Sequence, residues 1–386
     1  MNLNAEALHG LRVVDLTRVL GGPYCTQILG DHGAEVVKVE PPSGDETRGW
    51  GPPFDDGVAS YFLGVNRNKK SIVLDLSMQK DRDVLLSLLR DADVLVENFK
   101  PGTLKRWGLD YEGVLSKKFP KLIHCCISGF GEHGPLGGLP GYDAAIQAIC
   151  GLMSVNGEAQ SGSLRIGVPI VDLVTGLNAM IGILLALQER ERSKLGQSID
   201  ISLYDCALSV LHPHSANYFY SGKTPVRSGN RHSNISPYDA FETATSPIFL
   251  AVGNDSQFKK LASHLGRPEL AEDCRFRSNA DRVGSHSELK CELEELLRNH
   301  DGVRLADELA RIGVPSGAVQ TIDQALTSPH TKFRNMIVEL DGYRGTASPI
   351  KMSRSQPTYR LKPPRLGEHN DEVLEKSISP PVTQGI

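Results

Sequence analysis

The chain has 386 residues, of which 40% are hydrophobic and 23% are charged, and its formal net charge is -4. A chain of this length exceeds one ordinary hydrophobic core, so we expect two domains. The weakly acidic balance leaves no basic face for nucleic acid, although a few local cations are enough to bind a small anion.

Short apolar runs alternate with helical patterns in the N-terminal half. The predicted strands are Leu11–Leu16, Glu35–Glu40, Ser71–Leu76, Asp93–Phe99, Leu122–Gly129 and Ile199–Leu203. The predicted helices are Tyr24–Leu29, Asp81–Asp91, Asp172–Gln188 and a stretch that ends near Tyr218. Strands that alternate with helices favour the α/β class, with a parallel sheet covered on both faces.

The middle of the chain predicts a second, smaller domain. It follows Gly222–Ser236, a polar linker rich in Arg, Ser and Asn. Two strands are predicted at Tyr238–Thr243 and Pro247–Val252, and three helices at Ser256–Leu265, Ser287–Asn299 and Val303–Gly313. The segment after Met352 is rich in proline and polar residues, so we expect it to run extended over a surface.

The cellular compartment is predicted from the cysteines and the apolar segments. None of the seven cysteines forms a CxxC pair, and none shows a zinc spacing with the histidines, so core thiols in a reducing compartment are expected, with no metal. Met1–Gly10 has no apolar run of the kind that a secretory signal needs. Asp172–Gln188 is marginal for a bilayer and indicates a core helix. The sequence predicts a cytoplasmic protein, or an organelle-matrix protein in a eukaryote, without a membrane partner.

Common catalytic motifs are absent. No GxGxxG opens a helix after a strand, and there is no P-loop, no GxSxG elbow and no HExxH. Candidate ligand positions are therefore the strand ends of the sheet. Val19–Pro23 offers glycines and a helix start to an anion, or else forms a tight turn. Asn66–Lys70 and Glu97–Gly102, followed by Lys105 and Arg106, offer cations to phosphates, or else form a solvated surface.

Two acidic residues lie at predicted helix starts. Asp143 is expected to cap the helix that follows it, and the neighbouring Tyr142 either donates its hydroxyl to a ligand or packs. Asp172 lies between apolar residues at the mouth of the long apolar helix. Its position alone favours an N-cap, and a nucleophilic carboxylate is the alternative.

Taken together, the chain resembles the family III coenzyme A transferases, the group that contains formyl-CoA transferase and carnitine CoA-transferase. The resemblance covers nearly the whole chain and is carried by the order and spacing of Leu11–Glu40, Asn66–Leu76, Val96–Leu109, Ile127–Pro135, Pro140–Leu152 and Gly196–Cys206. It implies a Rossmann-like large domain made of residues 1–221 and 329–386, a smaller α+β domain made of residues 222–328, and an interlocked homodimer.

The resemblance also implies the site. Asp172 would be the nucleophile, acyl-CoA and a carboxylic acid would be the substrates, and no cofactor would be bound permanently. The implied CoA contacts are Leu20, Gly21, Leu74, Asp75, Leu76, Asn98, Phe99, Lys100, Arg106 and Tyr142. A carboxylate with a pKa near 4 is ionised at pH 7 without a base, and we expect backbone N–H groups near Asp172 to stabilise the oxyanions.

Two other functions stay open at this point. An α-methylacyl-CoA racemase belongs to the same superfamily, but in racemases a histidine stands where this chain has Tyr142, and tyrosine is a poor base at pH 7. A non-catalytic acyl-CoA-binding protein is the other, and the intact Asp172 argues against it.

The substrate is predicted from what the linker contains. The segment Ser228–Phe241 lacks the glycine run of the formyl-CoA transferases, which disfavours oxalate and formate. Arg165, Arg227, Arg231 and His232 are candidates for binding a second carboxylate, or else are surface charges. We expect succinyl-CoA as the CoA donor and a C4–C5 dicarboxylate as the acceptor.

Overall fold

The computed structural model describes residues 6–378, so the ends of both terminal segments lie outside the described residues. The chain divides into two compact units. Unit 1 comprises Met1–Leu152, Ile166–His212 and Pro329–Ile386, and unit 2 comprises Met153–Arg165 and Pro213–Ser328. The division expected at 221/222 differs from this one, because residues 153–165 and 213–221 group with unit 2.

Unit 1 is built on a six-stranded sheet in the order β5-β2-β1-β6-β7-β8, in which every pair is parallel. Its strands are β1 (Arg12–Asp15), β2 (Glu35–Glu40), β5 (Lys69–Val73), β6 (Val94–Glu97), β7 (Ile123–Ser128) and β8 (Ser198–Ser202). The predicted α/β class is confirmed. The chain starts in the middle of the sheet, runs to one edge and then to the other, so the strand order reverses between β1 and β6. Open sheets of this kind bind ligands at that reversal.

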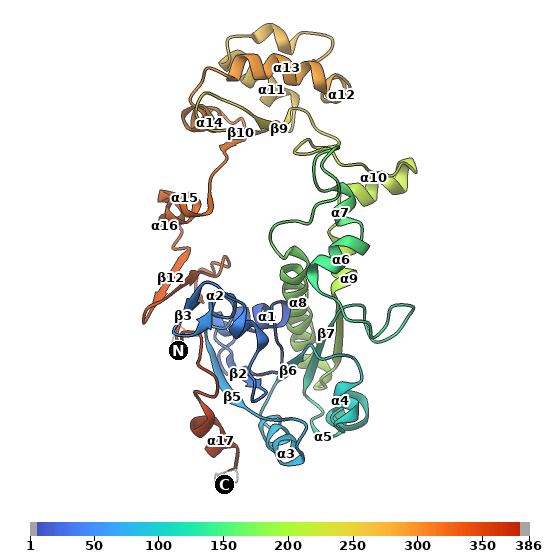
Figure 1. Ribbon diagram of the computed structural model, residues 1–386, viewed down its shortest axis with the longest axis vertical. Helices are drawn as coiled ribbons and strands as arrows, with labels where there is room; N and C mark the ends of the chain where they lie inside the picture. The colour runs from blue at the N-terminus through green and yellow to red at the C-terminus, as the bar shows by residue number, and fades with distance from the viewer. Residues whose placement is uncertain (1–5, 379–386) are drawn as a thin grey trace. The chain divides into compact units, whose positions relative to one another are not determined.

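Helices cover both faces of the sheet (Figure 1). Alternate residues of one strand point to opposite faces, so Val13 packs with α1 and α8 while Val14 packs with α3 and α17. The helices of unit 1 are α1 (Gly21–Asp31), α2 (Ser60–Leu63), α3 (Gln79–Leu88), α4 (Thr103–Arg106), α5 (Ser116–Lys118), α6 (Asp143–Ile149), α8 (Ile170–Ser193), α9 (Leu203–Ser209), α16 (Pro329–Phe333) and α17 (Asn370–Ile378). The short helix α7 (Leu152–Val155) lies where the two units meet in the sequence.

Helix α8 is long and apolar enough to cross a membrane by length and composition alone. In the fold it packs against α1, and its buried residues Val171, Ala179 and Ile183 belong to the main core. The contact with α1 is close because it involves glycines. A Cβ added to Gly176 would lie 2.5 Å from the carbonyl oxygen of Gly21. Glycine at both positions therefore lets the two helix starts approach each other.

The C-terminal segment lies along the edge strand β5. The N–H of Asn68 donates to the carbonyl of Leu361 at 2.8 Å, and the N–H of Val73 donates to the side chain of Asn370 at 2.9 Å. The segment thereby satisfies donors that an edge strand otherwise leaves open. Two hairpins complete unit 1, β3 (Phe54–Asp55) with β4 (Val58–Ala59) and β12 (Ile337–Leu340) with β13 (Tyr343–Thr346).

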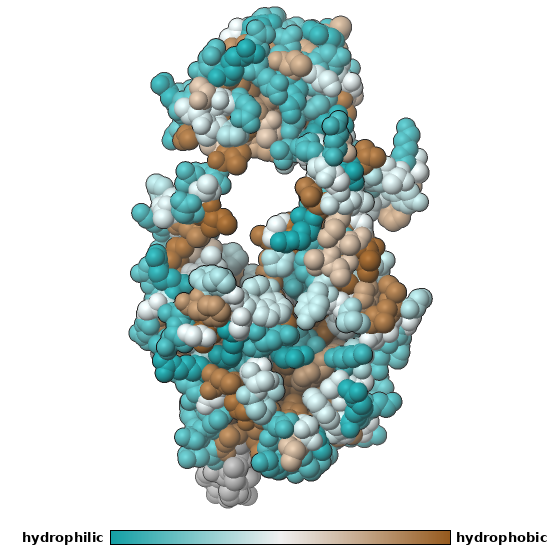
Figure 2. Space-filling view, viewed as in Figure 1, coloured by the Kyte–Doolittle hydropathy of each residue, from teal (hydrophilic) through white to brown (hydrophobic). Residues whose placement is uncertain are grey.

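Unit 2 has its own antiparallel sheet, in the order β11-β10-β9, and its own core. Its strands are β9 (Tyr238–Phe241), β10 (Ile248–Ala251) and β11 (Ser316–Ala318), and its helices are α10 (His214–Ser221), α11 (Asp255–His264), α12 (Asn279–Gly284), α13 (His286–Leu297), α14 (Gly302–Arg311) and α15 (Ile322–Thr327). Helices α11, α13 and α14 bury one side each in this core, and the face of this unit seen in Figure 2 is mostly hydrophilic.

Candidate active site

A cavity of about 210 Å³ lies where the strand order of unit 1 reverses. The segments that follow β1, β6 and β7 line it, together with the first turn of α8 and the loop before α6. The lining residues are Arg18, Val19, Leu20, Gly21, Gly22, Glu46, Asn98, Phe99, Lys100, Pro101, Ile127, Ser128, Gly129, Leu139, Pro140, Gly141, Tyr142, Asp172 and Leu203. All of them belong to unit 1.

Asp172 is the third residue of α8 and does not cap it. The capping position is Pro169, which has no side-chain acceptor. Asp143, at the start of α6, caps α8 instead: its Oδ2 accepts the N–H of Val171 at 2.8 Å and the N–H of Asp172 at 3.2 Å. Two interpretations from the sequence were wrong. Asp143 caps a helix other than its own, and Asp172 leaves its carboxylate free of that task.

Gln147 fixes the Asp143 carboxylate in place. Nε2 of Gln147 donates to Oδ1 of Asp143 at 2.6 Å, and the side-chain oxygen Oε1 of Gln147 accepts the N–H of Ile166 at 2.8 Å. Because both Asp143 and Gln147 are buried, each hydrogen bond replaces one that water would have made. Asp143 therefore holds the first turn of α8 by hydrogen bonds, and Gln147 holds Asp143. The backbone that carries Asp172 is fixed as a result.

The carboxylate of Asp172 has no hydrogen bond or ion pair within residues 6–378. Burial, and secondarily the charge of Asp143, raises its pKa from 3.8 to about 7. The expectation of a carboxylate with a pKa near 4 was therefore wrong. The N–H groups of Val171 and Asp172 donate to Asp143, so they are not available to the carboxylate of Asp172. A more basic and poorly solvated carboxylate is a stronger nucleophile once it is ionised.

The start of α1 supplies the N–H groups that the start of α8 does not. Leu20 occupies the capping position of α1 and provides no side-chain cap. Within the described residues the N–H groups of Gly21 and Gly22 have no acceptor, as is usual for a first helical turn. A Cβ added to Gly21 would lie 3.7 Å from Oδ1 of Asp172. The backbone of Gly21 therefore lies close to the carboxylate of Asp172, at a helix start of the kind that binds anions.

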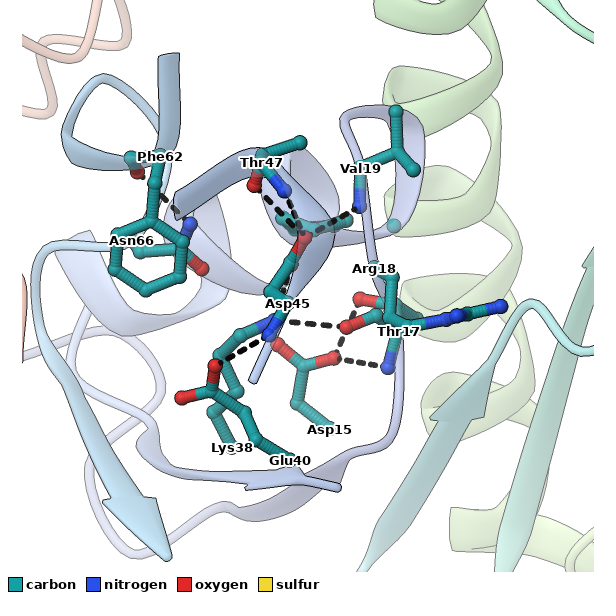
Figure 3. A network of polar contacts seen from close by, with 12 residues as sticks. Asp15, Thr17, Arg18, Val19, Lys38, Glu40, Asp45, Thr47, Phe62 and Asn66 are labelled. Carbon is teal, nitrogen blue, oxygen red and sulfur yellow. Dashed lines mark hydrogen bonds and ion pairs between the residues drawn. The ribbon is translucent and has the colours of Figure 1, made fainter. Parts of the chain in front are cut away.

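The loop between β1 and α1 rests on a network of buried charges (Figure 3). Nζ of Lys38 donates to the carbonyl of Thr17 at 2.7 Å and to Oδ2 of Asp45 at 3.0 Å, and Oδ1 of Asp45 accepts the N–H of Val19 at 3.4 Å. Val19 has a φ of 71°, which is strained for a β-branched residue. Such a conformation costs on the order of 1–3 kcal/mol and persists only where the surroundings enforce it.

A second buried pair supports the same network. Nζ of Lys69 lies 3.1 Å from Oδ2 of Asp15 at the end of β1. Burial opposes ionisation of Asp15, but the charges of Lys69 and Lys38, together with hydrogen bonds from Thr17 and Thr26, lower the pKa of this carboxyl to about 2. Arg67 pairs with Asp31 at 2.6 Å. Arg67 and Lys69 are thus paired inside the protein and are not a phosphate site. Lys70 pairs with Glu35 at 3.0 Å and with Glu372 at 2.8 Å nearer the surface.

The structure brings together only part of the site that the sequence predicts. Leu20, Gly21, Asn98, Phe99, Lys100 and Tyr142 line the cavity with Asp172. The side chains of Leu74 and Leu76 are buried in the core, Asp75 accepts hydrogen bonds from Ser77, and Arg106 is exposed and donates to Thr103. Contact of CoA with Leu74 and Leu76 would have to involve their backbone.

The four candidates for a second carboxylate site, Arg165, Arg227, Arg231 and His232, all belong to unit 2. Arg227 donates to the carbonyls of Glu158 and Ala159 within that unit. The cavity that contains Asp172 is instead lined by residues of unit 1. The arginine that lines this cavity is Arg18, which sequence reasoning missed. The only signal was the place of Arg18 directly after a strand.

Tyr61 was missed as well. Burial, and then the charges of Asp172 and Asp143, raise the pKa of Tyr61 to about 12, so this hydroxyl is coupled electrostatically to both carboxylates.

The candidate site thus combines an open parallel sheet with the poorly solvated carboxylate of Asp172 in the cavity where the strand order reverses. CoA-transferase family III matches residues 8–370, so the chain belongs to this family and is a CoA-transferase. Succinate–glutarate CoA-transferase of Agrobacterium fabrum is 40% identical over 381 residues, covering 95% of this chain and 94% of that protein. Acetyl-CoA:oxalate CoA-transferase of Acetobacter aceti is 40% identical over 374 residues, covering 96% of each.

A solved structure shows the same fold. The crystal structure of a CaiB/BaiF family protein from Brucella suis aligns with a TM-score of 0.87 and 42% identity, covering 97% of this chain and 100% of that one. The predicted family is confirmed.

Proposed function

We propose that this CoA-transferase moves CoA from succinyl-CoA to a C4–C5 dicarboxylate such as glutarate, with Asp172 as the nucleophile. The observation that carries the proposal is the carboxylate of Asp172, which has a raised pKa and no partner among the described residues in the cavity at the strand-order reversal. The name of the relative from Agrobacterium fabrum supports the substrate pair.

In the first half of the reaction, Oδ of ionised Asp172 attacks the thioester carbonyl. The C–S bond breaks, CoA leaves as a thiolate, and a mixed anhydride joins Asp172 to the succinyl group. The thiolate then attacks the aspartyl carbonyl, which releases succinate and leaves CoA as a thioester on Asp172. The acceptor carboxylate attacks this thioester and reverses the sequence, so that Asp172 is regenerated with the new acyl-CoA.

The surrounding groups have distinct roles in these steps. The N–H groups of Gly21 and Gly22 would stabilise the oxyanion of each tetrahedral intermediate. The half-buried position of Asp172 limits water, which would otherwise hydrolyse the anhydride. The raised pKa of Asp172 increases its reactivity, at the cost of the ionised fraction at neutral pH.

Acetyl-CoA and oxalate form the second candidate pair, because a relative with that name is also 40% identical. The racemase alternative is less favoured. A racemase needs two acid–base groups that face one α-carbon, and the ionisable side chains that line this cavity within residues 6–378 are Arg18, Glu46, Lys100, Tyr142 and Asp172, with no histidine. The homodimer and the cytoplasmic location stay predictions.

The test combines trapping with a substrate panel. The enzyme is incubated with succinyl-CoA, and the peptide that contains Asp172 is analysed by mass spectrometry. We expect CoA as an adduct on Asp172, and loss of both adduct and turnover in Asp172→Ala. The panel offers oxalate, malonate, ¹³C-labelled succinate, glutarate and acetate as acceptors, the label being needed because transfer to succinate otherwise regenerates the donor. Turnover that survives Asp172→Ala contradicts the nucleophile, and a panel without a C4 or C5 product contradicts the substrate class.

A further inference from the structure

Arg18 is a cation in the cavity that contains Asp172, and its guanidinium has no partner in the described part of the chain. Its side chain lines the cavity, and no hydrogen bond or ion pair of its guanidinium exists within residues 6–378. Its Nε is buried without a partner. The neighbouring buried cations differ from it, since Lys38 pairs with Asp45 at 3.0 Å and Lys69 pairs with Asp15 at 3.1 Å. A buried donor of this kind normally has an acceptor, so its partner is expected to be a ligand.

The backbone of Arg18 is fixed on both sides. Oδ1 of Asn98 accepts the N–H of Arg18 at 2.9 Å, and Nδ2 of Asn98 donates to its carbonyl at 2.7 Å. The next residue, Val19, has the strained φ of 71° that Asp45 helps to enforce. In Figure 3 the side chain of Arg18 points away from the Asp15, Lys38 and Asp45 cluster. The guanidinium is thus presented by a rigid loop, which lowers the cost of ordering it on binding.

The geometry points to Arg18 as the receptor for the distal carboxylate of the dicarboxylic acid, in both the acyl-CoA and the free acceptor. This inference rests on the proposed function and deepens it. The reacting carbonyl must meet Asp172, and Arg18 lines the same small cavity. A C4–C5 diacid has its second carboxylate only a few bonds from that carbonyl, and a guanidinium binds a carboxylate through two parallel hydrogen bonds.

Phosphate is the other anion that the substrates carry. In CoA the phosphates are separated from the thioester by the whole pantetheine arm, so they would lie outside a cavity that contains the reacting carbonyl. The exposed Lys100, on the loop after β6, lines this cavity and also lines a second cavity that shares Phe99 and Pro101 with it. Lys100 is therefore the better placed cation for a phosphate, and Arg18 for the carboxylate.

The experiment compares two acceptors with the wild-type enzyme and Arg18→Gln. Glutarate and its monoamide have the same length, but glutarate has a second carboxylate where the monoamide ends in a neutral amide. We expect the wild type to prefer glutarate in kcat/KM by about 100-fold, because the charged pair is formed in a poorly solvated site, and Arg18→Gln to lose most of that preference. Arg18→Lys keeps the charge without the two parallel donors and should retain part of it.

The controls separate the possible sources of an effect. Lys100→Gln should raise the KM of every acyl-CoA and leave the ratio of glutarate to monoamide as in the wild type. An unchanged ratio in Arg18→Gln overturns the inference. So does a loss in Arg18→Gln that is equal for both acceptors and confined to the KM of acyl-CoA, since that assigns Arg18 to phosphate. If the wild type transfers CoA to no dicarboxylate, the proposed function fails before Arg18 is tested. Thermal unfolding of each variant shows whether it is folded.

Discussion

Replacing Asp143 with asparagine tests how the site sets the reactivity of Asp172. The substitution removes the neighbouring negative charge and keeps an oxygen that can accept the N–H groups of Val171 and Asp172. Burial is the larger cause of the rise in the pKa of Asp172 from 3.8 to about 7, so Asp143 contributes less than half of it. We therefore expect the pKa of Asp172 to fall by roughly 1 in Asp143→Asn.

The consequence is visible in the pH profile. With a pKa of about 7, Asp172 is about 10% ionised at pH 6, and with a pKa of about 6 it is about 50% ionised. In kcat/KM for the acyl-CoA substrate, which reports the free enzyme, the acidic limb should move to lower pH by roughly 1, and the rate at pH 6 should rise about 5-fold relative to the rate at pH 8.5.

A control keeps the charge and removes a hydrogen bond. Gln147→Leu loses the amide that donates to Asp143 at 2.6 Å, so it should lower stability and leave the acidic limb near pH 7. Asp143→Asn should also lower stability, by about 1–3 kcal/mol, because the new amide faces the N–H of Gln147 and leaves a donor unsatisfied. A limb that does not move in Asp143→Asn, or a wild-type limb near pH 4, would refute the account of the Asp172 pKa.

Two further predictions concern stability. Asp172 binds a proton more tightly in the folded protein than in the unfolded chain, so its contribution to stability is present below pH 4 and is lost as pH rises through 7. Asp172→Asn should therefore be inactive and, because the site is partly solvated, more stable than the wild type by only roughly 1–2 kcal/mol at pH 8, with the difference gone at pH 4, as measured by urea unfolding. Gly176→Ala places a Cβ 2.5 Å from the carbonyl of Gly21, which should cost about 1–3 kcal/mol and reduce turnover. Gly182→Ala on the same helix meets side-chain methyl groups, those of Ile199 at 3.1 Å and Ile201 at 3.9 Å, and no backbone, so it should be less destabilised than Gly176→Ala in thermal unfolding. Equal losses in the two variants would contradict the backbone contact.

Much of the fold follows from local patterns. Hydrophobic periodicity located each of the six strands of the parallel sheet, with shifts of a few residues: the third strand is Lys69–Val73 and was expected at Ser71–Leu76. This shift has a physical cause. Lys69 is fully buried and pairs with Asp15, whereas a lysine in a sequence is normally taken as a sign of an exposed position. The long helix continues to Ser193, beyond its predicted end at Gln188. The prediction stopped early because it followed apolar residues, and the last turn of this helix is polar.

The site was less accessible to the sequence. The preference for aspartate at helix starts concerns residues that are close in sequence. It therefore predicted that Asp143 and Asp172 each cap the helix that they begin. The hydrogen bonds of Asp143 instead reach a backbone 29 residues away. Likewise, Arg18 and the cations of Asn66–Lys70 look alike in sequence, and only their partners distinguish a free guanidinium from paired ones.

The sequence by itself determined the α/β class, the family and Asp172 as the candidate nucleophile, because hydrophobic period and the order of short motifs are carried by residue identity alone. Only the tertiary structure decided that Asp143 caps α8, that burial raises the pKa of Asp172 to about 7, and that Arg18 lines the same cavity without a partner for its guanidinium among residues 6–378. The physical reason is that capping, desolvation and charge pairing depend on distances between atoms, and the fold sets those distances between residues far apart in the chain.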